Sequence, residues 1–208
     1  MNGRLLTGTD GRSRCWWCGT DELYTSYHDN EWGQPLHGEA AVLEKLCLEG
    51  AQAGLSWITI LRKRARYREV FDGFDPYAVA AFDDRNVELL MADTGIVRNR
   101  AKITAAIDNA RATVELLEKG ASLDALCWSF RPPRRAARLT ELEELRVTCA
   151  EAIALSKQLK RLGFRFVGPT TMYAFMQSSG MIDDHIEGCW VTAPMADGGD
   201  ATEKTPSR

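Results

Sequence analysis

The sequence predicts an all-α fold. Apolar residues recur at helical spacing through most of residues 39–178, and no series of segments alternates apolar with polar residues as half-buried strands do. Residue types that start and end helices divide this pattern into several separate helices. The 208 residues, 45% of them hydrophobic, suffice for one sizeable core or for two small lobes that share it.

Three helices are predicted in the N-terminal half of this pattern. The first covers residues 39–50 and ends near Gly50. Ser56 is a residue type that favours the position just before a helix, so a second helix is expected over residues 57–71. A third helix begins at Pro76, because proline fits the first turn of a helix, where its missing N–H costs nothing.

The helical pattern continues in the C-terminal half. One helix ends near Asp93, and a long amphipathic helix covers residues 98–119. A basic loop that contains proline follows over residues 131–138. Residues 141–162 are expected to form one or two helices, and residues 170–178 a short one.

The two helices on either side of Gly95 are predicted to form an αα-hairpin. Gly95 can adopt the left-handed backbone that ends a helix. The next helix then begins with free backbone N–H groups beside Arg98, Arg100 and Lys102, and such a helix end binds phosphate oxygens well. The hairpin is either an ordinary structural connection or an element that grips the DNA backbone without reading its sequence.

Charge and hydropathy exclude some classes of protein. A net charge of −3 argues against a generally basic nucleic-acid binder, but positive charge is concentrated in four clusters, at residues 62–68, 98–102, 131–138 and 157–165. No run of about 18 apolar residues could span a membrane. Because the N-terminus lacks the apolar core of an export signal, we expect a cytoplasmic protein with no membrane partner.

Cysteine and histidine residues stand in pairs near the two ends of the chain. Cys15 and His28 lie near the N-terminus, and His185 and Cys189, four residues apart, lie near the C-terminus. Two thiolates and two imidazoles would complete a tetrahedral zinc shell with no position left for water, so such a site is structural rather than catalytic. It would tie both ends of the chain together.

A redox role is the alternative interpretation of the first cysteines. Cys15 and Cys18 form a C-x-x-C motif, and six cysteines in a reducing compartment are more often thiols or metal ligands than disulfides. A C-x-x-C redox couple is typical of a strand-to-helix junction in a βαβ unit, which the sequence does not predict here.

Glu49 is a carboxylate on an apolar stripe. It follows Leu46 by three residues and Val42 by seven, and it lies near the C-terminal end of its predicted helix. Burial and the negative end of the helix dipole both disfavour a free carboxylate there. The side chain either pairs with a nearby Lys or Arg or faces a cationic ligand. Trp57 is close in sequence, and an aromatic face with a carboxylate suits a flat cationic heterocycle.

Six motifs give the chain a family resemblance. Between about Arg14 and Cys189, they resemble in kind and order those of the 3-methyladenine DNA glycosylase I family: CWW, SYHDNEWGQP, LCLEGAQAGLSWITIL, GIVRNRAKI, GFRFVGPTTMYAFMQSSG and DHIEGC. The resemblance implies a helix-hairpin-helix DNA glycosylase fold with a zinc-binding lobe built from the N- and C-terminal segments. It also implies one structural zinc ion per chain, held by Cys15, His28, His185 and Cys189.

The resemblance further assigns the residues that contact base and DNA. Base recognition falls to Tyr27 and Glu49, ring stacking to Trp17 and Trp57, and a further place in the aromatic pocket to Trp32. The turn Gly54-Leu55 matches the segment of the family that enters the DNA stack.

The implied activity is hydrolysis of the N-glycosidic bond of N3-methyladenine in double-stranded DNA. It would release free 3-methyladenine and leave an abasic site. No lysine nucleophile for strand cleavage stands out, so we expect a monofunctional enzyme. We also expect it to be a monomer. The sequence leaves open whether Glu49 acts chemically or only in recognition, and which other alkylated bases are accepted. A zinc-stapled DNA-binding module without activity is the alternative function.

The domain organisation follows from the same motifs. We expect one catalytic unit, with a helix-hairpin-helix lobe and a zinc lobe made of two chain segments. The expected ranges are a flexible N-terminal extension at 1–13, the catalytic unit at 14–193, the helix-hairpin-helix lobe around 55–130, the zinc lobe from 14–54 and 140–193, and a disordered tail at 194–208.

Overall fold

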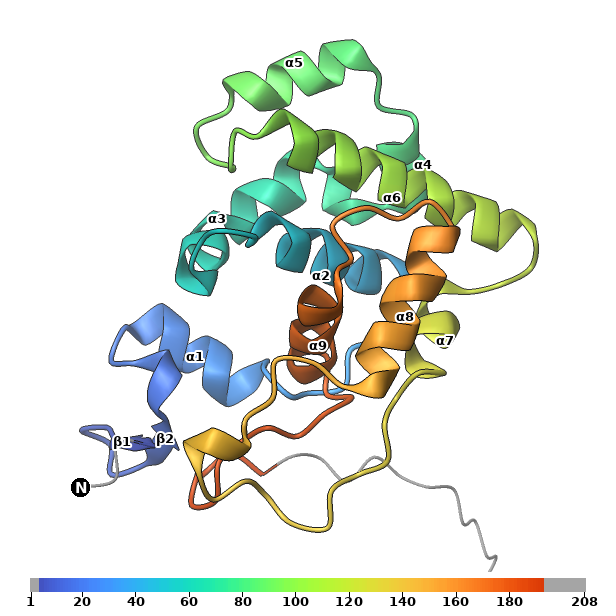
Figure 1. The fold of residues 1–208 in the computed structure, drawn as a ribbon. Helices are drawn as coiled ribbons and strands as arrows, with labels where there is room; N and C mark the ends of the chain where they lie inside the picture. The colour runs from blue at the N-terminus through green and yellow to red at the C-terminus, as the bar shows by residue number, and fades with distance from the viewer. Residues whose placement is uncertain (1–3, 193–208) are drawn as a thin grey trace, which may run out of the picture.

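The computed structural model describes residues 4–192, and most of them are helical (Figure 1). The α-helices of this part of the chain are α1 (Glu22–Asn30), α2 (Glu39–Ala51), α3 (Trp57–Val70), α4 (Pro76–Ala80), α5 (Asp84–Ala92), α6 (Arg100–Glu118), α7 (Leu123–Trp128), α8 (Ala150–Arg161) and α9 (Pro169–Ser178). Short 3-10 turns η1 (Trp16–Cys18), η2 (Asp72–Phe74) and η3 (Leu142–Glu144) join them. The predicted mainly helical architecture is therefore confirmed.

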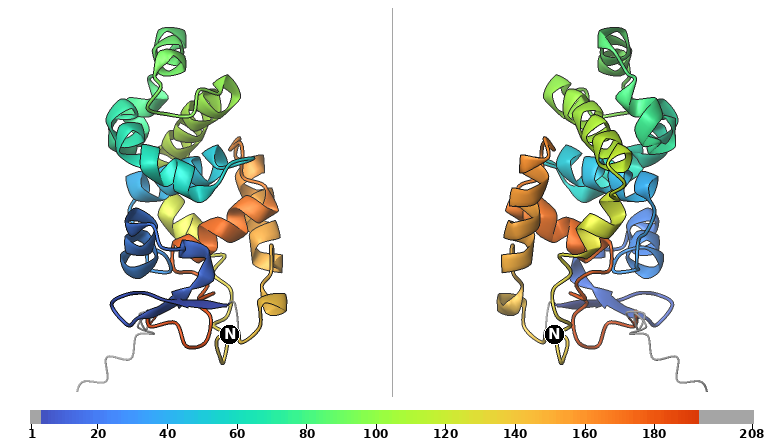
Figure 2. Two further views of the ribbon diagram at one scale, coloured as in Figure 1. Left: turned by 90° about the vertical axis from the view of Figure 1, so that its left-hand side faces the viewer. Right: turned by 90° about the vertical axis from the view of Figure 1, so that its right-hand side faces the viewer.

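Helix α2 lies at the centre of the molecule. It contacts α3, α4, α6, α7 and α9, and its residues from Leu46 to Ala51 are all buried. The side views in Figure 2 place the helices α3 to α6 (cyan to yellow-green) at one end and the terminal segments (blue and red) at the other. The C-terminal end of α2 thus carries Glu49 into the region between these two ends.

Most helix boundaries follow local rules. Helix α3 begins after Ser56, and α4 begins at Pro76, where Asp75 accepts hydrogen bonds from the N–H groups of Tyr77 and Ala78. Both starts confirm the sequence prediction. Within residues 141–162, however, only α8 and the short turn η3 are helical, and helices α1 and α7 were not predicted.

The hairpin of α5 and α6 forms as predicted, but the reason for its glycine differs. Gly95 does not have the left-handed backbone that was expected. It is required instead by close packing, because a Cβ at this position would lie 2.6 Å from Cγ of Arg66. Arg66 in turn forms an ion pair with Asp93, at 2.7 Å, and so fixes the turn between the two helices.

A small β-hairpin precedes the helices and was missed by the sequence prediction of a flexible extension. Strands β1 (Leu5–Thr7) and β2 (Ser13–Cys15) pair antiparallel, with Leu5 opposite Cys15. Strands of three residues carry too little alternation to be recognised, and this pair is held by tertiary contact. Trp190 donates a backbone hydrogen bond to the carbonyl of Ser13 at 2.8 Å, so the first and last segments of the described chain lie side by side (Figure 1).

No helix within residues 4–192 is long and apolar enough to cross a membrane. The predicted disordered tail at 194–208 lies outside the described residues.

Candidate functional site

A cavity of about 250 Å³ opens beside the C-terminal end of α2. Side chains from α1, α2, α3, α9 and the terminal segments converge on it, so the wall is assembled from distant parts of the sequence. The lining residues are Trp16, Trp17, Tyr24, Tyr27, Trp32, Glu49, Gln52, Trp57, Leu145, Arg146, Ala174, Gln177, Ser178 and Asp184. All five residues expected to recognise a base are among them: Trp17, Tyr27, Trp32, Glu49 and Trp57.

Aromatic rings form most of the apolar wall. The rings of Trp17 and Trp32 lie 4.8 Å apart at 65°, and those of Tyr27 and Trp57 lie 5.4 Å apart at 43°. The indole N–H of Trp57 is buried and has no acceptor in the described part of the chain. Such a wall offers flat faces for stacking on a ring system of similar shape.

Glu49 is a buried carboxylate in the wall of this cavity. It is only 5% exposed, and Oε1 accepts a hydrogen bond from the hydroxyl of Ser178 at 2.8 Å. Burial raises the pKa of Glu49 above its ordinary value, while the charge of Lys45 and the hydrogen bond from Ser178 oppose that change. A carboxylate in this position is poised to bind a positively charged or N–H-bearing group.

Lys45 supplies the cationic neighbour that the position of Glu49 suggested, although the sequence did not single it out. It lies one turn before Glu49 on α2, and is 8% exposed. Its Nζ lies 3.4 Å from the hydroxyl of Tyr27 and 5.2 Å from the ring centres of both Tyr27 and Trp57. Lys45 does not line the cavity itself, so it lies behind the aromatic wall.

Several other lining residues were not found from the sequence. Tyr24 lies on α1 three residues before Tyr27, with its ring 5.2 Å from that of Trp17. It could have been found by helical spacing if α1 had been predicted. Gln177 and Asp184 belong to a separate network, in which the side-chain amide of Gln177 donates to Asp184 at 2.7 Å. No local sequence signal brings that network to the cavity.

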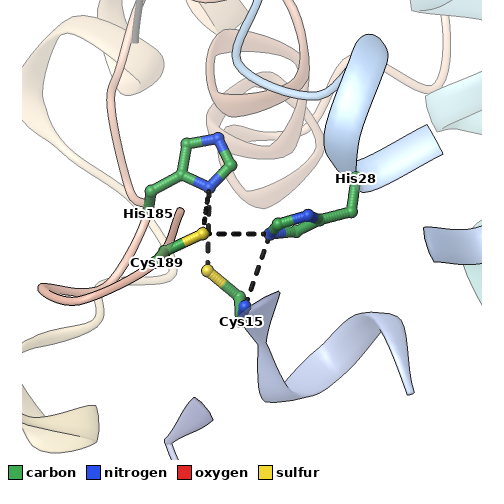
Figure 3. A group of neighbouring side chains, drawn as sticks. All are labelled: Cys15, His28, His185 and Cys189. Atoms are coloured by element: carbon green, nitrogen blue, oxygen red, sulfur yellow. Dashed lines mark hydrogen bonds between the residues drawn. The ribbon is translucent and has the colours of Figure 1, made fainter. Parts of the chain in front are cut away.

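Cys15, His28, His185 and Cys189 converge on one buried point (Figure 3). The candidate donor atoms all lie within 4.8 Å of one another. Sγ of Cys189 lies 3.5 Å from Nε2 of His28 and 3.5 Å from Nδ1 of His185, and Sγ of Cys15 lies 3.7 Å from the same Nδ1. A tetrahedral zinc ion separates its sulfur and nitrogen ligands by about 3.6 Å, given the usual bond lengths. The four residues therefore fit a metal ion, as their sequence spacing predicted.

Outer contacts orient the two imidazoles of this cluster. Nδ1 of His28 lies 2.8 Å from the carboxylate of Asp29, which also accepts hydrogen bonds from Arg14 and from the indole N–H of Trp190. Nε2 of His185 lies 3.3 Å from the carbonyl oxygen of Trp32. In each imidazole, one nitrogen is thus held by the protein and the other faces the cluster, as metal-bound histidines require.

The geometry of the cluster distinguishes between the two interpretations of the C-x-x-C motif, as part of a metal site or as a redox pair. Cys15 belongs to the cluster, where its Sγ lies 3.7 Å from Nδ1 of His185, and it does not form a pair with Cys18. Cys18 lies outside the cluster and donates to the carbonyl of Cys15 at 3.1 Å. Burial raises the pKa of Cys18 to about 11, which disfavours a redox thiolate.

The residues expected to contact DNA lie in the turn between α2 and α3 and around the start of α6. Gly54 has a left-handed backbone, with φ of 77°, in the turn between α2 and α3, and the next residue, Leu55, is 42% exposed. Arg98 is exposed, and Arg100 is exposed and paired with Glu88 at 2.8 Å. These side chains are accessible to a partner.

Lys102 has a different environment from that expected of a phosphate contact. Its Nζ donates to the carbonyl oxygens of Ala51 and Ala53, each at 2.7 Å. The amine thus neutralises the C-terminal end of α2 and holds the turn that contains Gly54 and Leu55. The half-buried amine is therefore bonded to the protein itself, and its expected contact with DNA stays a prediction.

Fold and cavity together define a class of protein. A helical fold around an aromatic cavity with a buried carboxylate is an arrangement that suits enzymes that extrude a nucleotide to act on its base. DNA glycosylases are the members of this class that match the helical fold. The chain belongs to the methyladenine glycosylase family, whose model matches residues 17–192.

Individual relatives support this assignment. The chain is 47% identical over 177 residues to DNA-3-methyladenine glycosylase 1 of Escherichia coli (strain K12). The aligned residues cover 85% of this chain and 95% of that protein. A crystal structure of 3-methyladenine DNA glycosylase I is similar, with a TM-score of 0.82, 46% identity, and coverage of 85% of this chain and 98% of that one. A variant of such an enzyme in complex with 3-methyladenine gives a TM-score of 0.77 and 34% identity, over 81% and 91% of the two chains.

Proposed function

We propose that this protein hydrolyses the N-glycosidic bond of N3-methyladenine in alkylated DNA and leaves an abasic site. The observation that carries the proposal is the cavity, in which Tyr27, Trp17, Trp32 and Trp57 surround the buried carboxylate of Glu49. A DNA-binding module without activity does not need such an arrangement. A relative that binds 3-methyladenine supports the same ligand here.

The chemistry follows from the charge of the damaged base. Methylation at N3 makes the base cationic, so it leaves readily when the bond to the sugar breaks and its electron pair returns to the ring. A water molecule adds its oxygen to the sugar carbon and loses a proton, and the free base departs neutral. Glu49 stabilises the cationic base in the cavity, together with the hydroxyl of Tyr27, while the tryptophans stack on its ring.

The enzyme is proposed to be monofunctional. Strand cleavage by a glycosylase needs an amine that can attack the sugar, and no lysine of residues 4–192 lines the cavity. Lys45 lies behind the rings of Tyr27 and Trp57, where it cannot reach a sugar without displacing them.

DNA binding is proposed to centre on the turn between α2 and α3 and on the α5–α6 hairpin. Leu55 is the exposed apolar side chain that can enter the base stack when a nucleotide is extruded, and the left-handed Gly54 allows the sharp turn before it. Arg98, Arg100 and the backbone beyond Gly95 then bind phosphates, while Lys102 supports the turn from inside.

The metal of the terminal cluster is proposed to be one structural zinc ion. Two sulfur and two nitrogen donors from both ends of the chain fill all four positions of a tetrahedral shell, so the ion would contribute stability rather than bind a reacting water. The cluster shares a wall with the cavity, since the rings of Trp32 and His185 lie 4.6 Å apart. We propose that the terminal lobe therefore positions part of the base-binding wall.

A release assay tests the proposed activity directly. Purified protein with its metal content measured is incubated with DNA alkylated by a methylating agent, and free bases are separated by chromatography. We expect 3-methyladenine in the soluble fraction and alkali-labile abasic sites in the DNA. If folded, metal-loaded protein binds the DNA but releases no base, the alternative of a DNA-binding module replaces this proposal.

The outer contact of His28 gives a prediction for the metal. Replacing Asp29 by asparagine removes the carboxylate that holds Nδ1 of His28 at 2.8 Å while keeping the size of the side chain. We expect zinc affinity to fall about 10- to 100-fold, as it does when other metal-bound histidines lose the hydrogen-bond partner of their outer nitrogen. Competition with a chromophoric chelator measures this change, and Asp124→Asn, at the exposed His37, is the matched control. Equal zinc affinity in the Asp29 variant and the wild type would remove Asp29 from this role.

A further inference from the structure

Lys45 is a buried cation that the proposed mechanism does not use. Of the lysines within residues 4–192, it alone is buried. No carboxylate oxygen lies within ion-pair distance of its amine in this part of the chain. Instead, Nζ approaches the hydroxyl of Tyr27 at 3.4 Å and lies over the rings of Tyr27 and Trp57. A buried charge with this little direct compensation is costly, so its position requires an explanation.

The geometry links Lys45 to the charge of the cavity. Lys45 and Glu49 are one turn apart on α2 and therefore share a helix face, so their charges act on each other even though they do not form an ion pair. Both are more than nine-tenths buried. Two opposite charges in a region from which water is excluded interact much more strongly than on a surface, and each favours the ionised form of the other.

Other titratable or charged groups face Lys45 and Glu49 from each neighbouring element. They are the phenols of Tyr24 and Tyr27 from α1, Glu31 at its end, Glu44 on α2, Arg64 from α3, and Arg146 and Asp184 from the loops around the cavity. Arg64 is paired with Glu31 at 2.8 Å and Asp184 with Arg135, so these charges are largely compensated. Among the facing groups, Lys45 is the cation whose charge acts on the pKa of Glu49.

We propose that Lys45 is a positioning residue that keeps Glu49 ionised in the free enzyme and so readies the cavity for a cationic base. It acts from behind the wall, through Glu49 and the hydroxyl of Tyr27, and does not touch the base. The proposal rests on the proposed function for its consequence in catalysis, but not for the charge coupling itself.

The effect on pH dependence has a definite sign. Burial raises the pKa of Glu49 and lowers that of Lys45, and the charge of each residue opposes the change at the other. Activity that needs the carboxylate is lost as the pH falls through this pKa. Without the ammonium, the pKa of Glu49 rises further, so the acid limb of the activity profile moves to higher pH.

The coupling is tested first without any activity measurement. The side-chain carboxyl carbons of glutamate are labelled with carbon-13, and the signal of Glu49 is identified by its absence in Glu49→Gln. The titration of this signal is compared in wild type, in Lys45→Met, which puts an uncharged side chain one heavy atom shorter in this place, and in Lys157→Met on the exposed face of α8. We expect the midpoint to rise by about one pH unit or more in Lys45→Met, and not in Lys157→Met. An unchanged midpoint in Lys45→Met overturns the proposal.

A reciprocal titration covers the case in which Lys45→Met does not fold. Coupling between two sites is mutual, so Glu49→Gln must lower the pKa of Lys45 by the same amount. Carbon-13 at the lysine Cε reports this titration in protein that retains Lys45. No change in the Lys45 midpoint would count against the coupling as directly as the first experiment.

The activity profile then connects the coupling to catalysis. In the release assay, the acid limb of kcat/KM should move in Lys45→Met by the same amount as the Glu49 midpoint, and Lys45→Arg should restore it. If wild-type protein releases no 3-methyladenine while the two titrations remain coupled, the proposed function fails and the coupling stands. If release is normal and its acid limb is the same in Lys45→Met, the role of Lys45 is refuted while the function stands.

Discussion

Replacing Glu49 by glutamine is expected to slow the release of 3-methyladenine by about 10- to 100-fold, the effect of losing about 1.5–3 kcal/mol from a hydrogen bond to a charged group. Glutamine has nearly the same shape, and its side-chain oxygen can still accept the hydrogen bond from Ser178 that Glu49 accepts at 2.8 Å. What disappears is the negative charge opposite a cationic base. Because this charge is 5% exposed, little water screens it, and its loss should affect catalysis more than folding.

The measurement separates binding from chemistry. Single-turnover release from alkylated DNA gives the rate of the chemical step, and nuclear magnetic resonance titration with free 3-methyladenine gives base affinity. If Glu49 acts only in recognition, both base affinity and kcat/KM fall while the single-turnover rate at saturating DNA changes little. If it also stabilises the transition state, the single-turnover rate falls as well.

An exposed carboxylate provides the matched control for this substitution. Glu118→Gln, at the C-terminal end of α6, removes the same charge far from the cavity wall and should leave release unchanged. Retained zinc and a cooperative thermal transition establish that Glu49→Gln is folded. Wild-type release and base affinity in that folded variant would be incompatible with any role for Glu49.

The position of Glu49 illustrates how much of the site a sequence can predict. Its place on the apolar stripe of α2 follows from helical spacing alone, and its conflict with burial indicates a function. The same spacing places Lys45 on that face, one turn earlier, so this cation was within reach of the same argument. In contrast, Ser178 comes from α9, and only the packing of α9 against α2 brings its hydroxyl to the carboxylate.

The fold was predictable where local signals agree with packing. Helix α6 has a complete apolar stripe, and it forms over nearly the whole predicted length. Helix α1 was missed because only two of its residues, Tyr27 and His28, are buried, and two adjacent residues form no apolar stripe. The opposite error occurred before α8, where helix-forming residues such as Glu141 make a short turn and an ion pair with Arg4 at 2.7 Å instead.

Replacing His185 by alanine is expected to abolish stoichiometric zinc binding and to lower the free energy of unfolding by about 4–5 kcal/mol, the effect of releasing a cross-link that closes a loop of more than 100 residues. His185 contacts both cysteines of the cluster, with Nδ1 3.5 Å from Sγ of Cys189 and 3.7 Å from that of Cys15. Without it, three donors remain and two buried cysteines lose their partner. Metal analysis and chemical denaturation measure the two effects.

The other face of His185 extends the prediction to the cavity. Its ring lies 4.6 Å from that of Trp32, and its Nε2 holds the Trp32 carbonyl at 3.3 Å. Loss of the imidazole should therefore loosen one wall of the base-binding cavity and weaken the affinity for free 3-methyladenine even at temperatures where the variant is folded. A purely remote staple would lower stability and leave base affinity unchanged.

The third histidine of the chain supplies the control for His185→Ala. His37 is 60% exposed, lies 3.1 Å from Asp124, and stacks on Trp128 with ring centres 4.4 Å apart. It is a surface interaction worth about 1 kcal/mol or less, so His37→Ala should keep one zinc ion per chain and nearly wild-type stability. The four-ligand centre requires this contrast, because His185 belongs to the cluster and His37 does not. One tightly bound zinc ion per chain in His185→Ala would show that the remaining donors suffice and that the proposed centre is wrong.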